Sequence, residues 1–225
     1  VTSSTTSQIT LNNSDTLTVS GGGSIVYTGA AATTGSWKTF SSSATTITNA
    51  GTISASASQA ISHSKSTDFS LNNSGTISTA NGQGYAVYLP WPMGTTVITN
   101  SGTISSGDWA GIDVSSGEDV TITNSGTISA TTTQAIRANS VATDKLVINN
   151  SGTISGTNTV IYLANSDGIT LTNSGTISAS GGSPIWAYYT DDTTITNTGT
   201  ISGSTYGMSD IGYSGADMVL VNKGT

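Results

Sequence analysis

A histidine beside serines and an aspartate is the first group in this sequence that could do chemistry. The chain has one histidine, His63, with Ser62 and Asp68 close by. Such residues catalyse acyl transfer when the imidazole can take the proton of the serine hydroxyl. However, no Gly-x-Ser-x-Gly motif is present, serine recurs along the whole chain, and His63 continues the alternation that begins at Ile61. We therefore expect no enzyme activity from this group.

Asp113 and Arg137 are a second pair with chemical potential. They occupy matching outward positions in two successive copies of a predicted strand. Polysaccharide-cleaving folds use clustered acids, or acids beside a base, on an outer face, and a carboxylate there could also hold calcium. An ion pair between neighbouring strands is the simpler interpretation, and pairs of this kind contribute little when exposed.

Aspartate recurs seven or eight residues before a repeated glycine, at Asp68, Asp119, Asp144, Asp167, Asp192 and Asp217. We expect a solvated acidic edge that opposes lateral aggregation. A row of weak calcium sites is the alternative, because calcium prefers carboxylate and carbonyl oxygens. Cys/His metal-ligand spacings and phosphate-binding loops are absent from the sequence, so we expect no cofactor apart from that calcium.

Aromatic side chains give the strongest indication of binding. Most of them lie on or beside one predicted strand of each repeat. Outward rings at stacked positions can form a flat strip, which suits sugar rings or a protein partner, since Tyr and Trp combine an apolar face with a polar tip. The alternative is that these rings only cover turns and the edge of the core. The strip is expected at Tyr88, Trp109, Tyr162, Trp186 and Tyr188.

These residues are set within a repeat that is marked by the motif Asn-x-Gly-Thr-Ile-Ser. Its glycines are Gly51, Gly75, Gly102, Gly126, Gly152, Gly175, Gly199 and Gly224. A period of about 25 residues indicates a stacked solenoid. A degenerate first copy is expected at residues 11–17, with Asn13 in the asparagine position and Asp15 in the glycine position.

Each repeat predicts three short strands. In one copy Val120, Ile122 and Asn124 alternate with outward threonines, Ser125-Gly126 turns the corner, and glycine is expected there to supply a positive φ. Further inward positions follow on a second and a third strand. The fold class is therefore all-β: a right-handed, three-sided parallel β-helix of about nine coils and about 43 Å. Residues 1–225 form one domain, with an irregular coil or cap at 1–44 and regular coils at 45–225.

One asparagine of each repeat lies two residues after an inward isoleucine or leucine. We expect its amide to bond to the amides above and below, forming an internal ladder that removes the cost of burying an unpaired polar group. The ladder positions are Asn49, Asn73, Asn100, Asn124, Asn150, Asn173, Asn197 and Asn222.

Charge and composition narrow the classes of partner. Five Lys and Arg residues and twelve Asp and Glu residues give a net charge of −7, and such a surface repels the phosphates of nucleic acids. No apolar run is long enough to cross a membrane, so we expect no membrane insertion. The absence of cysteine suits a prokaryotic surface protein that depends on strand stacking.

Tandem Asn-x-Gly-Thr-Ile-Ser units with Ser/Thr/Gly-rich variable turns resemble the passenger regions of bacterial autotransporter adhesins and related surface β-helix proteins. The resemblance covers about residues 9–225, without the C-terminal membrane barrel of that family. It implies an extracellular or cell-surface, non-enzymatic structural or adhesive module that binds glycans or proteins. The alternative is a subunit of an extracellular filament or surface layer, assembled by docking the Thr225 end onto the Val1 end of another copy.

Overall fold

In the part of the chain that the structure describes, twenty-seven parallel strands form three nine-stranded sheets. The computed structural model describes residues 2–5, 9–11, 16–27, 32–34, 45–56, 59–64, 68–80, 84–92, 94–141, 146–205, 209–211 and 218–225. Each coil contributes one strand to each sheet, so neighbours in a sheet are one repeat apart in sequence. The prediction of a parallel β-helix is confirmed.

The strands of each sheet follow one another along the axis of the solenoid. Sheet A holds β1 (Ser4–Thr5), β4 (Ser24–Tyr27), β7 (Thr52–Ala55), β10 (Thr76–Thr79), β13 (Thr103–Ser106), β16 (Thr127–Ala130), β19 (Thr153–Gly156), β22 (Thr176–Ala179) and β25 (Thr200–Ser202). Sheet B holds β2 (Ile9–Leu11), β5 (Ala32–Thr34), β8 (Ile61–His63), β11 (Val87–Pro90), β14 (Ile112–Ser115), β17 (Ile136–Asn139), β20 (Ile161–Ala164), β23 (Ile185–Tyr188) and β26 (Ser209–Ile211). Sheet C holds β3 (Thr16–Val19), β6 (Thr45–Asn49), β9 (Phe69–Asn73), β12 (Thr96–Asn100), β15 (Val120–Asn124), β18 (Leu146–Asn150), β21 (Ile169–Asn173), β24 (Thr193–Asn197) and β27 (Met218–Asn222).

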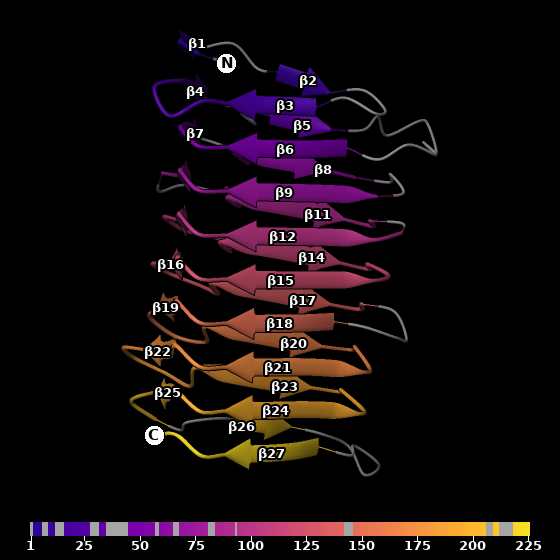
Figure 1. The fold of residues 1–225 in the computed structure, drawn as a ribbon. Coiled ribbons are helices and arrows are strands. Elements are labelled where there is room, and N and C mark those ends of the chain that lie inside the picture. Colours follow the sequence, from indigo (N-terminus) through magenta and orange to yellow (C-terminus); the bar gives the residue numbers. More distant parts are fainter. Residues whose placement is uncertain are drawn as a thin grey trace.

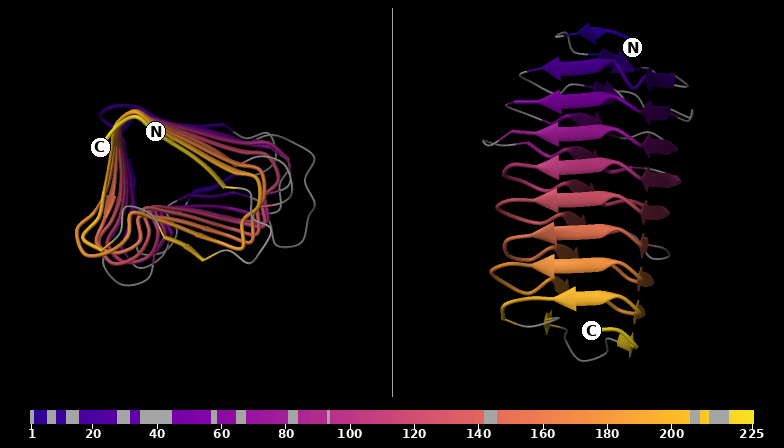
Figure 2. Two further views of the ribbon diagram at one scale, coloured as in Figure 1. Left: turned by 90° about the horizontal axis from the view of Figure 1, so that it is seen from below. Right: turned by 60° about the vertical axis from the view of Figure 1, so that its left-hand side comes forward.

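The coil is right-handed and three-sided. In Figure 1 the front strands of sheet C run from right to left, the strands of sheet B behind them run from left to right, and the chain descends from the N-terminus. Viewed along the axis, the coils superpose as a triangle with the three sheets as its sides (Figure 2). Because every strand between the two end coils is hydrogen-bonded to the coil above and below, the interior needs no other layer.

Like side chains stack on like in the interior. In sheet A, Ile77 lies in register with Ile53 on one side and Ile104 on the other, and this column continues through the sheet. The column is fully buried from Ile25 to Ile177, and Ile201 of the last coil is partly buried. Each buried isoleucine contributes about 1.5–3 kcal/mol relative to an exposed one. No coil could bury this surface alone, so the repeats stabilise one another.

The asparagine ladder is present in sheet C. Each side-chain Nδ2 donates to the Oδ1 of the asparagine in the next coil, at 2.7–2.8 Å, in an unbroken series from Asn49 to Asn222. The same Nδ2 also donates to backbone carbonyls, as Asn124 does to Gly126 and Thr153. Seven of the eight side chains are buried, and Asn222 is exposed. The repeat motif therefore encodes the fold, since each buried amide finds its partner one coil away.

The repeated glycine is required by close backbone packing. A Cβ added to Gly126 would lie 2.1 Å from the carbonyl oxygen of Gly102, and the same conflict occurs along the whole corner. The expectation of a positive φ at these glycines is wrong, because Gly94 and Gly168 are the described glycines with a positive φ. Left-handed residues occur instead at the corner after sheet B, at Trp91, Ser116, Ser140, Asn165 and Tyr189, with φ between 48° and 55°.

The first coil follows a different register from the one expected. The residue opposite Asn49 in the preceding coil is Val19, and Gly23 occupies the place opposite Gly51. Asn13 and Asp15, where the ladder position and the corner of this coil were expected, lie outside the described part of the chain. Within the expected irregular segment 1–44, strands β1 to β5 extend all three sheets. Residues 35–44 lie outside the described part, so a cap there stays a prediction.

Candidate binding surface on sheet B

One outward column of sheet B carries most of the functional side chains predicted from the sequence. Tyr88 on β11 is in register with Asp113 on β14, which is in register with Arg137 on β17. The column continues to Tyr162 on β20 and to Trp186 on β23. An ion pair thus lies in the middle of the column and an aromatic ring lies on each side of it. Strand alternation explains this placement, because all five residues are the second residue of their strands.

Asp113 is the most buried residue of this column. Asp113 has no exposed side-chain area, and its Oδ2 accepts a hydrogen bond from Nη1 of Arg137 at 2.6 Å. Its Oδ1 accepts from the Ser115 hydroxyl at 2.8 Å. Burial acts to lower the pKa of Arg137, but the hydrogen bond and charge of Asp113 raise it above its usual value. The guanidinium therefore remains charged and is held in one orientation.

Three aromatic rings lie next to the ion pair. Tyr85 stacks on Tyr88 with ring centroids 4.6 Å apart, and its edge meets Trp109 at 5.3 Å and 68°. Burial, followed by the negative charge of Asp113, raises the pKa of Tyr85 to about 12 and also raises that of Tyr88. Both phenols therefore remain protonated and can donate hydrogen bonds at neutral pH. Trp109 is 46% exposed.

The aromatic group opens onto a pocket of about 250 Å³. The pocket extends across the turns before β11, β14 and β17, so three successive coils build it. Its lining combines rings, an amide and the guanidinium: Tyr85, Trp109, Ala110, Thr133, Gln134 and Arg137. Such a combination of apolar faces and a few convergent polar groups is typical of small-molecule sites.

A second aromatic group lies beyond Arg137. Tyr162 and Trp186 meet at 6.3 Å and 60°, and Tyr188 meets Tyr189 edge to face at 4.2 Å. The indole nitrogen of Trp186 is buried without a hydrogen-bond partner within the described residues. Tyr189 is 41% exposed and has a left-handed φ of 51°, a strained conformation for a bulky side chain. This group offers exposed rings but, among the pockets described, none is lined by it.

The expected strip is thus two groups rather than one continuous band. Tyr88 and Trp109 are brought together through Tyr85, whereas Tyr162 and Trp186 belong to the second group. Tyr188 lies one outward position further along β23, opposite Ala164. Sequence reasoning missed the link between the ion pair and the rings. The sequence nevertheless indicates this link, since Asp113 and Arg137 have the same position in their strands as Tyr88 and Tyr162.

The residues around His63 are not arranged as a catalytic triad. His63 is fully buried on the inward side of β8, with its ring 4.4 Å from that of Phe69. Burial lowers the pKa of His63 to about 4. Ser62 is on the opposite face of the strand, and Oδ1 of Asp68 accepts a hydrogen bond from the backbone N–H of Thr95 at 2.9 Å. The imidazole therefore has no route to the Ser62 hydroxyl.

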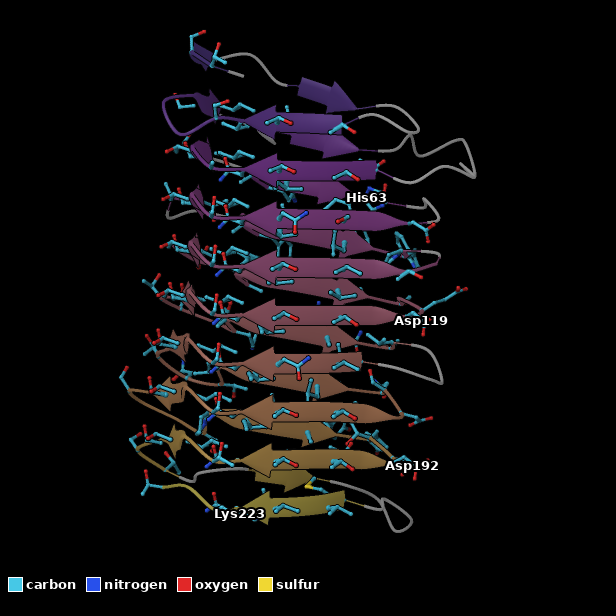
Figure 3. All side chains as sticks on the ribbon, in the orientation of Figure 1. His63, Asp119, Asp192 and Lys223 are labelled. Carbon is cyan, nitrogen blue, oxygen red and sulfur yellow. The ribbon has the colours of Figure 1, made fainter. Side chains whose placement is uncertain are left out.

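The acidic edge follows the corner between sheets B and C. Figure 3 shows Asp119 and Asp192 pointing outward at this edge, and both are exposed. The Oδ1 of Asp167 accepts a backbone N–H from Asp191 at 3.2 Å. The described residues contain no group of three acidic, histidine or cysteine side chains that could hold a metal. Asp144 and Asp217 lie outside the described residues, so the calcium row stays a prediction.

Comparison with known proteins gives no relative for this arrangement. No protein-family model, no curated protein and no solved structure matches the chain. Within the described residues there is also no helix with the length and apolar character needed to cross a membrane. Any functional conclusion therefore depends on the residues and their geometry.

Proposed function

We propose that this chain is a non-enzymatic, extracellular β-solenoid module with a structural and adhesive role at a prokaryotic cell surface. It would act as a rigid rod that presents sheet B and its neighbouring turns to glycans or to a protein partner. The Asn-x-Gly-Thr-Ile-Ser repeat supports an autotransporter-like passenger as the kind of protein involved. The lack of cysteine and the low charge content of 8% are consistent with this role.

The aromatic surface of sheet B is the observation that carries the proposal. Rings that only shield a core have no need to be as exposed as Trp109, Trp91 and Tyr189, at 46%, 46% and 41%. Exposed aromatic residues on a rigid scaffold lose little conformational entropy on binding, and they are enriched among residues that dominate binding energy. The outer face of sheet C offers a contrast, because its strand residues are mainly small polar ones such as Thr121 and Thr123.

Binding to immobilised polysaccharides and to cells tests this function. We expect the purified chain to bind at least one such surface, and the triple variant Trp109→Ala/Trp186→Ala/Tyr188→Ala to bind at least about tenfold more weakly, because each buried ring contributes on the order of 1 kcal/mol or more. The matched control is Thr121→Ala/Thr123→Ala on sheet C, which should bind as the wild type does. Wild-type binding by the triple variant would reject the adhesive role of sheet B.

Self-assembly is the alternative function, and one observation favours it. At the last coil Val219, Leu220 and Val221 are 52%, 50% and 37% exposed. Leu220 lines an open apolar hollow together with Ile185, Ile195 and Ile201. Another coil, whether from the same chain or from a second copy, would cover this surface and pair with the free edge of β27.

The first coil is a poor match for that surface. A second copy stacked head to tail would place Val19 opposite Asn222 and Thr5 in the column of Ile201, because Val19 and Thr5 hold these positions in β3 and β1. The Asn222 amide would then be buried without its ladder partner, at a cost of about 1–3 kcal/mol. We therefore place adhesion first. Sedimentation velocity over a range of concentrations separates the two functions. A sedimentation coefficient that rises with concentration for the wild type, but not for Leu220→Lys, would favour assembly.

A further inference from the structure

The pocket formed by the turns before β11, β14 and β17 has the features of a sugar site. We propose that it binds one neutral hexopyranose unit, with the sugar ring against Trp109 and its hydroxyls on Gln134, Arg137 and Tyr85. The inference depends on the proposed adhesive function and gives that function a ligand class and a location. It uses the 250 Å³ pocket and the ion pair beneath it.

The two ring planes form a corner that suits a pyranose. Trp109 is half exposed and meets Tyr85 at 68°, so one indole face can stack on the apolar C–H face of a sugar while the tyrosine closes one side. Stacking of Tyr85 on Tyr88 holds the tyrosine in place. Because the rings are fixed before binding, little conformational entropy is lost.

Polar groups without protein partners converge on the same pocket. The side-chain amide of Gln134 forms no hydrogen bond within the described residues, although it is half-buried. Arg137 uses Nη1 for Asp113, and its remaining N–H groups have no acceptor there. The Tyr85 phenol is protonated at neutral pH and can donate a hydrogen bond; burial and the charge of Asp113 raise its pKa further, to about 12. One amide, one guanidinium edge and one phenol can together hydrogen-bond to several sugar hydroxyls.

Charge decides between a neutral and an acidic sugar. Arg137 is the positive group of the pocket, and the fully buried Asp113 already compensates it at 2.6 Å. Asp108 immediately precedes Trp109 and adds a negative charge, with its Oδ1 bonded to the Thr132 hydroxyl at 3.1 Å. The described groups therefore sum to one negative charge, in a chain with a net charge of −7. A carboxylate or sulfate ligand would be repelled, whereas a neutral sugar would not.

The size of the pocket indicates one sugar unit. Pockets for drug-sized ligands occupy roughly 300–1,000 Å³, and the 250 Å³ here is slightly below that range. The remainder of a glycan would then extend over the outer face of sheet B, toward the second aromatic group. Contacts of several sites along the rod with one glycan chain would raise its apparent affinity.

Titration with simple glycosides tests the inference. The probes are the methyl glycosides of glucose, galactose and mannose, with glucuronate as the acidic comparison, followed by saturation-transfer NMR and tryptophan fluorescence. We expect at least one neutral glycoside to bind, independently of salt, and Trp109→Ala to raise its Kd at least about tenfold through loss of the stacking surface. Gln134→Ala should raise the Kd several-fold. Thr121→Ala/Thr123→Ala, on the outer face of sheet C, is the matched control and should leave the Kd unchanged.

Three results would overturn this inference without affecting the adhesive function: unchanged glycoside binding by Trp109→Ala, tighter binding of glucuronate than of every neutral glycoside, or no glycoside binding by a chain that still adheres to polysaccharide surfaces. Circular dichroism of each variant checks that the fold is retained, which is expected because Trp109 lies in an exposed turn. A chain that binds neither glycosides nor any glycan or protein surface would overturn the proposed function as well.

Discussion

At the scale of single residues, the identity of a side chain in this protein depends on its neighbour one coil away. Asn124 is buried with 0% exposure, which would destabilise an isolated coil, yet its amide has a partner above and below. The glycine two residues later is fixed by the carbonyl of the preceding corner. His63, in contrast, is a buried side chain that can be protonated. Protonation of the buried imidazole is unfavourable, so the free-energy cost of burying it depends on pH.

The ladder predicts a difference between its middle and its end. Asn124→Ala leaves Asn100 without its Oδ1 acceptor and Asn150 without its Nδ2 donor, inside the core. We expect a loss of about 2–4 kcal/mol in the free energy of unfolding. Asn222→Ala removes a single link at an exposed position and should cost less than about 1 kcal/mol. Urea unfolding of both variants checks this, and equal losses would contradict the ladder's role in stability.

His63 predicts a fall in stability between pH 6.5 and pH 4. Burial lowers its folded-state pKa to about 4, from the ordinary value of 6.5 that applies when the chain is unfolded. As the pH falls through 6.5 the unfolded state binds a proton that the folded state excludes, so the free energy of unfolding decreases until about pH 4. The loss attributable to this group is about 3 kcal/mol.

The variant His63→Leu isolates that effect, because Leu89 occupies the equivalent inward position on β11. Urea unfolding of both proteins at pH 7, 5.5 and 4 gives the difference between their stabilities, from which the shared contribution of the carboxylates cancels. We expect the free energy of unfolding of the variant to increase relative to that of the wild type as the pH falls. A difference that stays constant with pH would show that His63 does not titrate in this way.

At the scale of strands and corners, two kinds of sequence signal differed in reliability. Period-2 alternation placed the strands of all three sheets correctly, because a buried interior admits only one face of each strand. The asparagine ladder was also readable, since an asparagine two residues after an inward isoleucine or leucine must itself point inward. Both signals are local and recur in nearly every coil.

Signals that depend on contacts between coils were harder to read. The first coil was assigned from the motif at Asn13, whereas hydrogen bonding selects Val19 and Gly23, which lie in a glycine-rich corner of different length. The repeated glycine was attributed to its φ, whereas the cause is a carbonyl one coil away. The binding surface was only half predicted for the same reason: Tyr85 and Gln134 lie in variable turns, which carry no repeat signal.

The glycine corner predicts a contrast between two alanine substitutions. Gly126→Ala would place a Cβ 2.1 Å from a backbone oxygen that cannot move without separating two coils. We expect a loss of about 3 kcal/mol or more, at the upper end for overpacked positions. Gly22→Ala has no atom within 4 Å of the added Cβ and should change stability by less than about 0.5 kcal/mol. Thermal unfolding of the two variants provides the measurement, and similar midpoints would contradict close packing as the reason for glycine.

At the scale of the whole molecule, the protein is a one-dimensional stack in which each coil contacts only its neighbours. Its stability should therefore approximate a sum over coils and their interfaces, and the number of coils should be adjustable. The binding surface follows the same logic, since the pocket is built by three successive coils and the second aromatic group by the two coils that follow them. Length and binding are thus separable properties of the rod.

Deleting one complete coil tests this separation. Removal of residues 153–175 joins Gly152 directly to Thr176, so that β22 replaces β19 as the partner of β16 in the same register. In sheet B, β23 would then follow β17 and place Trp186 beside Arg137. We expect a folded, shorter rod with a moderately lower unfolding midpoint, because one coil and one interface are lost. Every remaining side chain still points to the same side of its sheet, inward or outward, as before.

Deleting the single residue Ile148 is the matched comparison. The change is far smaller, but it shifts the rest of β18 by one position and would turn Asn149 inward and Asn150 outward, breaking the ladder. We therefore expect the loss of one residue to destabilise the chain more than the loss of a whole coil, as measured by thermal unfolding and circular dichroism. The coil deletion should also retain glycoside binding at Trp109, since every residue that lines the pocket precedes the deleted coil. The opposite order of stabilities would mean that the stack does not behave as a sum of equivalent coils.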